Sequence, residues 1–182
     1  TGIVGENGAG KTTLFKALLG LVPIASGSAK INGQDIAALS LADRESIGTV
    51  LAESFFNDIY TIKDVNRLLK SFYRKFDESY FLRKCADFHL PQDQKLKEFS
   101  TGMKAKLKTL TALSHGAQLL ILDEPTSGLH FNEVALLLAA LFRLRDAGHT
   151  ILCVEHHKDL LNAADYLVDK GPGAGRHGGN IV

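Results

Sequence analysis

A glycine-rich stretch, GENGAGKT at residues 5–12, has the spacing G-x-x-x-x-G-K-[ST] of loops that bind phosphate groups. Gly8 and Gly10 allow backbone N–H groups to converge on phosphate oxygens, and a helix that begins at the loop adds its positive end. Lys11 is expected to reach the β and γ phosphates, and the Thr12 hydroxyl to bind Mg²⁺. An ordinary glycine-rich turn is the alternative, but it does not require this spacing between a strand and a helix. The predicted ligands are the phosphate groups of a nucleotide and Mg²⁺, and the predicted nucleotide contacts of the loop are Gly5, Asn7, Gly8, Gly10, Lys11, Thr12 and Thr13.

A second candidate site is the acidic pair Asp123 and Glu124, which directly follows the apolar run LLIL. In doubly wound sheets ligands bind at the carboxyl ends of strands, so these carboxylates should face the phosphate loop. Asp123 is predicted to hold Mg²⁺, and Glu124 to accept a proton from an attacking water. Taken alone, such a pair is often a solvated strand end. Beside a phosphate loop, it predicts nucleotide hydrolysis.

The elements that must position these residues alternate between strands and helices. Strand patterns occur at Ile3 and Val4 and in SIGTVLAES, QLLILDE and TILCVEH, and helical patterns follow the phosphate loop, Ser100 and the second acid. The alternation predicts an α/β fold with a mostly parallel sheet flanked by helices. An Asn-Gly pair at 32–33 predicts a hairpin. Residues from about Thr61 to Phe99 have a helical pattern with a break at Pro91, which predicts a helical subdomain at about 54–100 within one domain, 1–182.

Composition narrows the class of protein. A chain of 182 residues with 45% hydrophobic content can bury the core of a single domain. The net charge of +1 gives no bulk signal for nucleic acid or for an anionic membrane surface. Cys85 and Cys153 form no C-x-x-C pair, which argues against a zinc or disulfide framework and favours two core residues in a reducing compartment. No apolar run has the length of a membrane span, so a cytoplasmic location is expected.

The motifs GENGAGKTT, STGMK, LLILDEPTSGL and a histidine after a later strand together resemble those of the ATP-binding-cassette (ABC) ATPases. The resemblance covers nearly the whole chain and implies a P-loop nucleotide-binding domain. FSTGMK is similar to a variant of the LSGGQ signature, in which Ser100 and Gly102 match and Thr101 and Met103 depart. The resemblance implies that Ser100, Gly102 and their helix contact the γ-phosphate bound by the other protomer of a head-to-tail dimer. As an isolated motif, STGMK is a helix cap.

The resemblance also implies roles for a histidine and for an acidic residue. His156 matches the switch histidine of the family, which would hydrogen-bond the γ-phosphate and complete a catalytic set with Lys11 and Glu124. The neighbouring His157 is expected to point elsewhere and to be solvated. Where the family carries a Gln loop, the nearest candidate is Glu53, which could offer an oxygen to Mg²⁺ or could be a simple solvated acid.

The chain begins at Thr1 without Met and enters a strand almost at once. We interpret it as a fragment that lacks the first strands of the domain. The aromatic residue that this family stacks on adenine would precede it.

Two groups of this superfamily are similar to different parts of the chain. Up to about Leu122 it resembles the ATP-binding subunits of bacterial ABC transporters. From about Asp123 it is similar to the carboxyl-terminal end of the UvrA family of DNA-repair ATPases, with the markers GLHF, VEH, AADYLVD and GPGAG. DEPTSGL is common to both groups, and His130 stands where transporter relatives usually carry Asp. These patterns suggest a chimera, engineered or recombinant.

The expected function is ATP binding and hydrolysis by an ABC transporter subunit, with transmembrane partner subunits at the inner face of the membrane. A homodimer or heterodimer of nucleotide-binding domains is implied. The alternatives are a UvrA-like repair ATPase fragment and an inactive folded scaffold. A nucleic acid partner is not expected, because the chain has no basic stripe and no cysteine-rich zinc module.

Overall fold

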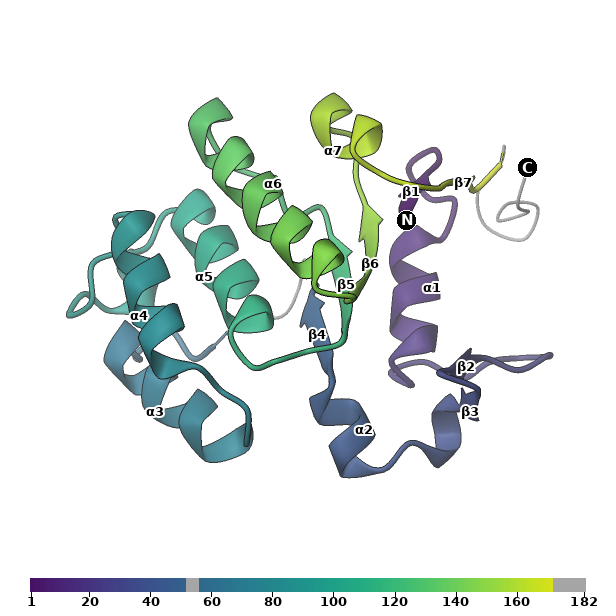
Figure 1. The fold of residues 1–182 in the computed structure, drawn as a ribbon, viewed down its shortest axis with the longest axis horizontal. Helices are drawn as coiled ribbons and strands as arrows, with labels where there is room; N and C mark the ends of the chain where they lie inside the picture. Colours follow the sequence, from purple (N-terminus) through teal and green to yellow (C-terminus); the bar gives the residue numbers. More distant parts are fainter. Residues whose placement is uncertain (52–55, 172–182) are drawn as a thin grey trace.

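A five-stranded sheet, parallel at every pairing, forms the centre of the computed structural model, which describes residues 1–51 and 56–171 (Figure 1). The strand order is β4-β5-β6-β1-β7. Figure 1 shows helices on both sides of the sheet. The prediction of an α/β fold with a parallel sheet is therefore confirmed. The strands are β1 (Gly2–Val4), β4 (Ile47–Val50), β5 (Leu119–Asp123), β6 (Thr150–Val154) and β7 (Leu167–Asp169).

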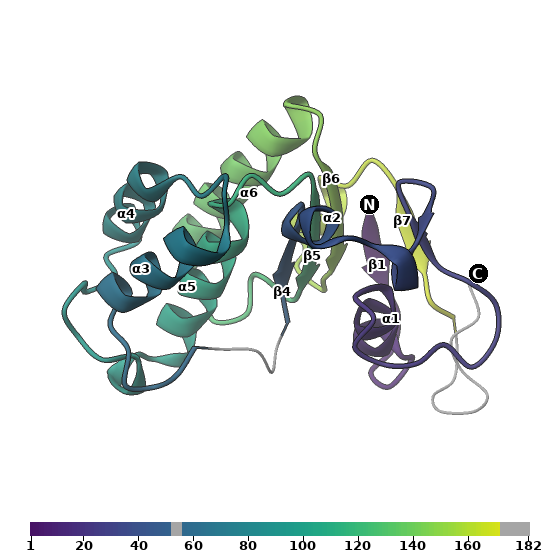
Figure 2. The same ribbon diagram turned by 90° about the horizontal axis from the view of Figure 1, so that it is seen from below.

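The helices that cover this sheet are α1 (Lys11–Leu18), α5 (Thr101–Leu113), α6 (Phe131–Asp146) and the short α7 (Lys158–Asn162). Successive side chains of β5 point to opposite faces, so the strand contributes to two hydrophobic clusters. Leu120 and Leu122 belong to the cluster that packs under α5 and α6. Ile121 packs with Phe15 of α1 in the other cluster. Figure 2 shows α1 on one side of the sheet and α5 on the other.

A hairpin connects α1 with β4, as the Asn-Gly pair predicted. Asn32 and Gly33 have φ angles of 51° and 81°, which are those of a type I′ turn. The chain then passes through a 3₁₀ turn into a short helix whose first turn is closed by a capping box between Ser40 and Asp43. These elements are β2 (Lys30–Ile31), β3 (Gln34–Asp35), η1 (Ile36–Ala38) and α2 (Leu41–Glu45).

The described residues between β4 and β5 form helices joined by loops, and these helices have a hydrophobic cluster of their own. The helices are α3 (Ile62–Phe72), α4 (Glu78–Asp87), η2 (Leu96–Glu98) and then α5. Val65 and Phe81 are fully buried in the cluster, and Leu107 of α5 continues it toward the sheet. A loop at Pro91 separates α4 from η2, as predicted. The limits 54 and 100 of a separate subdomain stay a prediction.

Both cysteines are free and buried, as expected. Burial raises the pKa of the Cys85 thiol to about 12, so this residue behaves as a small core side chain. In the part of the chain that the structure describes, no helix combines the length and the apolar character needed to cross a membrane.

Candidate nucleotide site

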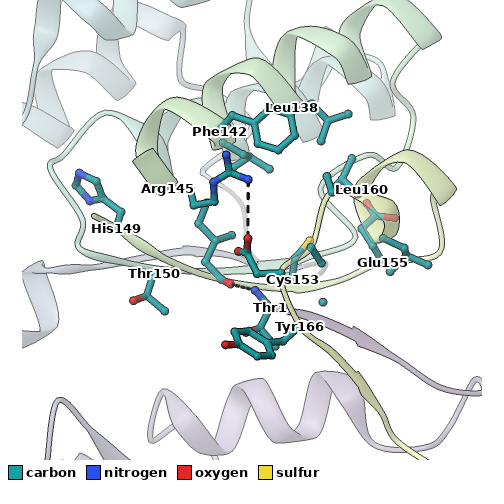
Figure 3. A pocket seen from close by; sticks show the side chains of 17 residues that line it. Thr1, Leu138, Phe142, Arg145, His149, Thr150, Cys153, Glu155, Leu160 and Tyr166 are labelled. Atoms are coloured by element: carbon teal, nitrogen blue, oxygen red, sulfur yellow. Dashed lines mark hydrogen bonds and ion pairs between the residues drawn. The ribbon is translucent and has the colours of Figure 1, made fainter. Parts of the chain in front are cut away.

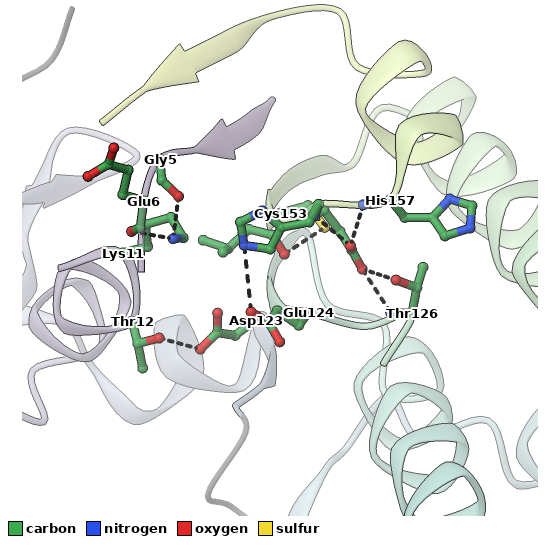
Figure 4. Close-up of polar contacts among 12 residues, drawn as sticks. Gly5, Glu6, Lys11, Thr12, Asp123, Glu124, Thr126, Cys153 and His157 are labelled. Atoms are coloured by element: carbon green, nitrogen blue, oxygen red, sulfur yellow. Dashed lines mark hydrogen bonds and ion pairs between the residues drawn. The ribbon is translucent and has the colours of Figure 1, made fainter. Parts of the chain in front are cut away.

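The phosphate loop lies between the end of β1 and the start of α1, and the side chain of Lys11 folds back into it (Figure 4). Lys11 Nζ donates hydrogen bonds to the carbonyl oxygens of Gly5 and Glu6, at 2.7 and 3.0 Å. Gly10 precedes α1 with a φ of 84°, a left-handed conformation that favours glycine. The first turn of α1 has N–H groups with no intrahelical acceptor. The loop thus offers an ammonium group and backbone donors to an anion, which fits a phosphate group.

A second lysine, Lys170, lies against this loop and had no predicted role. Its Nζ donates to the carbonyl oxygen of Gly10 at 2.9 Å, and its backbone N–H donates to the carbonyl of Val4 at 2.9 Å. Its own carbonyl oxygen is so close to Gly5 that a Cβ atom there would come within 2.4 Å. Burial, followed by the charge of Lys11, holds the pKa of Lys170 below its usual value. Lys170 therefore fixes the loop from the end of β7.

Thr12 and Asp123 come together as predicted. Thr12 Oγ1 donates a hydrogen bond to Asp123 Oδ2 at 2.8 Å, and Asp123 is 5% exposed (Figure 4). Hydroxyl and carboxylate oxygens suit Mg²⁺, which is usually bound by one or two carboxylates together with substrate phosphates. The pair therefore fits a Mg²⁺ ion that arrives with a nucleotide, although its role as a metal site stays a prediction.

Glu124 and His156 form an open pair at the carboxyl ends of β5 and β6. Glu124 has a φ of 49°, and its N–H donates to the carbonyl of Val154 at 2.9 Å, which ties the turn to β6. His156 Nε2 lies 3.8 Å from Glu124 Oε1, and the two side chains are 52% and 51% exposed. This separation is too long for a hydrogen bond, so both groups can reach a third molecule. A non-glycine residue in this conformation is unusual and is often found at functional sites.

The signature residues Ser100 and Gly102 lie at the start of α5, where Gly102 packs against the loop after β5. Ser100 is exposed and caps α5, where its Oγ accepts a hydrogen bond from the Met103 N–H at 3.2 Å. Gly102 packs against Gly128, and a Cβ atom on Gly102 would lie 2.4 Å from the Gly128 carbonyl oxygen. Within residues 1–51 and 56–171, neither Ser100 nor Gly102 shares a hydrogen bond with the phosphate loop. Their predicted contact with a phosphate group in another protomer stays a prediction.

The other predicted loop contacts, Asn7, Gly8 and Thr13, are exposed. Glu53, the acid predicted to replace the glutamine, lies outside the described residues. His130 precedes α6, and its backbone N–H donates to Glu133 Oε2 at 2.9 Å. Glu133 also forms an ion pair with Lys106 of α5, so this position belongs to the contact between two helices.

His157 differs from the expectation that it is solvated. Its side chain is 34% exposed, and Nδ1 is buried without a hydrogen-bond partner among the described residues. Figure 4 shows its ring directed away from Lys11 and Thr12. The strand ends at Val154, and His157 is the N-cap of α7, a helix that the sequence analysis did not predict.

Glu155 is a further site residue that the sequence analysis missed. It is 3% exposed, and its carboxylate accepts hydrogen bonds from Thr126, in the loop after β5. The signal was present in VEH, because an acid that directly follows a buried strand needs donors. The identity of those donors could not be read from the sequence.

Comparisons with known proteins give one family model and two kinds of relative. The model of the ABC transporter family matches residues 1–127. The UvrABC system protein A of Thermus thermophilus is 48% identical over 86 residues, which are 46% of this chain and 9% of that protein. The Clostridium tetani protein of the same name is 52% identical over 81 residues, 44% of this chain and 9% of its own length. The chain therefore spans about a tenth of the length of these curated relatives.

Solved structures with the same fold are ATP-binding cassettes. The ATP-binding subunit of an ABC transporter superposes with a TM-score of 0.81 and 26% identity, over 92% of this chain and 72% of the other. A dimeric cassette in a post-hydrolysis state with ADP and Pi has a TM-score of 0.79 and 20% identity, over 92% and 79% of the two chains. The fold, the phosphate loop and the family match over residues 1–127 lead to one conclusion. The chain is an ABC-type ATPase domain and belongs to the ABC transporter family.

Proposed function

We propose that this domain binds ATP with Mg²⁺ and hydrolyses it in a head-to-tail dimer, as the ATP-binding subunit of an ABC transporter. The observation that carries the proposal is that five side chains gather at one end of the sheet. Lys11 lies in the phosphate loop, Thr12 donates to Asp123, and Glu124 faces His156 at 3.8 Å.

Each of these groups has a distinct task in the proposed reaction. Lys11 would exchange its two loop carbonyls for phosphate oxygens, and the N–H groups at the start of α1 would bind the same anion. Thr12 and Asp123 would hold Mg²⁺, which when bound neutralises charge on the phosphate groups. Glu124 would accept a proton from water, and His156 would donate a hydrogen bond that orients the γ-phosphate.

An apolar groove favours a protein partner for this domain. It has a volume of about 670 Å³ and lies between α2 and β4 on one side and α3 and α5 on the other. Two of its lining residues, Leu41 and Phe72, are 80% and 68% exposed. Exposed apolar patches of this kind mark interaction sites. A transmembrane transporter subunit is the partner that the proposed function requires.

A UvrA-like role in DNA repair is the second candidate function. The identity of 48% with the Thermus thermophilus protein favours it. The near-neutral charge of +1 weighs against a large electrostatic contribution to DNA binding. Stimulation of hydrolysis by duplex DNA therefore separates the two candidates.

The similarity of the chain both to ABC transporter subunits and to UvrA also bears on its origin. We propose a recombinant or engineered chimera of an ABC transporter subunit and a UvrA-like protein. DEPTSGL, which is common to both groups, is the junction expected from the sequence. The UvrA relative, however, matches 86 residues, more than the segment from Asp123 to Val182 contains, so this likeness begins upstream of DEPTSGL and the junction of such a chimera would lie earlier in the chain. The sequence that flanks this chain in its source gene tests the proposal, because an uninterrupted UvrA gene would contradict it.

The decisive variant for the proposed function is Glu124→Gln. An amide cannot accept the proton from water, so turnover should fall by about 10²- to 10³-fold while ATP binding is retained. The measurement is phosphate release with and without duplex DNA, and the control is Asp87→Asn, which changes an exposed acid on α4. If Glu124→Gln and the wild type have equal turnover, Glu124 is not the base. If duplex DNA stimulates hydrolysis, the domain is a repair ATPase and not a transporter subunit. If the wild-type chain does not bind ATP, both ATPase functions are excluded and the inactive scaffold is the remaining alternative.

A further inference from the structure

Glu155 uses both of its carboxylate oxygens to join two loops of the site. Oε1 accepts hydrogen bonds from the backbone N–H and the hydroxyl of Thr126, at 2.8 and 2.5 Å. Oε2 accepts from the backbone N–H groups of His156 and His157, at 2.9 and 3.1 Å. The side chain is 3% exposed. A buried carboxylate is stable only where donors replace its water, and here four donors do so.

The two loops that Glu155 joins carry the exposed pair Glu124 and His156. Thr126 lies two positions after Glu124 in the loop after β5, and His156 directly follows Glu155 in the loop after β6. The backbone bond from Glu124 to Val154 joins the same two loops at a second point. Together these bonds fix where Glu124 and His156 stand relative to each other, whereas the two exposed side chains share only a contact of 3.8 Å.

A cavity lies beside Glu155, so the hydrogen bonds of the carboxylate are needed to hold the loop after β6 in place. A cavity of about 240 Å³ lies between α6, α7 and β6, and Glu155, Cys153 and Leu160 are among its lining residues (Figure 3). Figure 3 shows Glu155 and Leu160 close to each other beside the start of α7. If the carboxylate loses its partners, this cavity gives the loop after β6 room to shift, because close packing does not hold it on that side.

We infer that Glu155 is a positioning residue for ATP hydrolysis: through Thr126 and the two histidine N–H groups it sets the separation between Glu124 and His156. The inference rests on the proposed function. Glu155 touches neither substrate nor metal in this role. It acts through the loops, and a displacement of about 1 Å between reacting groups can cost about 100-fold in rate.

The test uses two isosteric variants, Glu155→Gln and Thr126→Val. The glutamine keeps one acceptor and replaces the other by an NH₂ group that cannot accept an N–H, so at least one of the two loops is released. The valine removes only the hydroxyl bond. We expect kcat to fall about 10- to 100-fold in Glu155→Gln and less in Thr126→Val, while KM and the dissociation constant for ATP stay within about threefold. In the double variant, the loss should be smaller than the product of the two single losses, because both act on one bond network.

The control is Thr109→Val, which removes another buried threonine hydroxyl whose partner is the Ala105 carbonyl in the same helix. It should leave kcat unchanged. Hydrogen exchange supplies a readout that does not depend on turnover, and the amides of His156 and His157 should exchange faster in Glu155→Gln.

Two results would overturn the inference. In the first, the wild-type chain hydrolyses ATP and both variants keep its kcat. In the second, the variants lose ATP affinity and thermal stability in parallel with kcat, as expected of a purely structural role. A wild-type chain that hydrolyses no ATP would instead refute the proposed function, and with it any role of Glu155 in hydrolysis.

Discussion

At the scale of single residues, the phosphate loop is held by two lysines with different tasks. Lys11 belongs to the loop and donates to two of its carbonyls, which phosphate oxygens can replace. Lys170 comes from the end of β7 and donates to the carbonyl of Gly10, the residue that precedes α1. Because it bonds to the backbone of the loop, Lys170 fixes the conformation that the phosphate groups would meet and adds a positive charge nearby.

Replacement of Lys170 by Met should therefore weaken ATP binding without abolishing hydrolysis. A charge-assisted hydrogen bond contributes about 1.5–3 kcal/mol, and discounting for the partial exposure of Lys170 leaves about 1 kcal/mol, or about fivefold in the dissociation constant. Titration with a fluorescent ATP analogue measures the change. The matched control is Lys30→Met, which removes an exposed lysine from the hairpin. Equal affinities of Lys170→Met and Lys30→Met would contradict this role.

The residues that could be predicted from sequence are those whose chemistry lies in a continuous motif. Gly10, Lys11 and Thr12 follow one another, and the strand before Asp123 shows where that acid must lie. Glu155 and Lys170 could not be predicted, because their hydrogen-bond partners are distant in the chain and no local sequence pattern identifies those partners. Thr126 is 29 positions from Glu155, and Gly10 is 160 positions from Lys170.

At the scale of elements, the start of α5 and the loop after β5 meet through two glycines. A Cβ atom on Gly128 would lie 3.0 Å from the Cα atom of Gly102, and Gly128 has a φ of 76°. A Cβ atom on Gly102 would approach the Gly128 carbonyl still more closely. The start of α5 can lie this close to the loop that follows Asp123 and Glu124 only because both positions lack side chains.

The variant Gly128→Ala should be more destabilising than an alanine at a glycine of similar conformation without neighbours. Gly27 is such a control, because its φ is 83° and a Cβ atom there would meet nothing within 4 Å. The left-handed conformation costs about 1–2 kcal/mol in both variants. Crowding against Gly102 adds a further cost of about 1–3 kcal/mol to Gly128→Ala alone. Urea unfolding measures both values, and equal losses would show that the contact is not close in solution.

The elements themselves were predictable where the hydrophobic pattern is long or where a turn has a distinct chemistry. The Asn-Gly turn and the runs of β5 and β6 are such cases. The short elements near the carboxyl end were not predicted. Leu167 of β7 is 57% exposed, so this edge strand shows no buried pattern, and α7 spans only Lys158–Asn162. Pairing with β1, rather than local propensity, makes β7 a strand.

At the scale of the whole molecule, the parallel sheet explains how distant residues form one site. Every pairing in the sheet is parallel, so the carboxyl ends of β1, β5 and β6 lie at the same edge. The phosphate loop, Glu124 and His156 follow these three strands. The motif order was enough to predict this fold class, whereas the position of β7 beside β1 and the cavity under α6 depend on packing that no single segment specifies.

The same geometry predicts how two copies of the domain should respond to ATP. Ser100 is exposed at the N-terminus of α5, and in the proposed dimer it faces the γ-phosphate bound by the partner. Asp and Asn are both good N-caps, so Ser100→Asp and Ser100→Asn should leave the helix and the monomer equally stable. Only the aspartate adds a negative charge that would oppose the phosphate groups.

Ser100→Asp, made in a Glu124→Gln chain that keeps ATP bound, should therefore abolish dimer formation in ATP. Ser100→Asn in the same chain should retain most of it. Light scattering at a fixed protein concentration, with and without ATP and Mg²⁺, measures the dimer fraction, and thermal unfolding checks that both monomers are intact. High salt should partly restore the aspartate dimer, because the repulsion between exposed charges is screened. If both variants dimerise equally well, Ser100 does not face a phosphate group, and its only task in this domain is to cap α5.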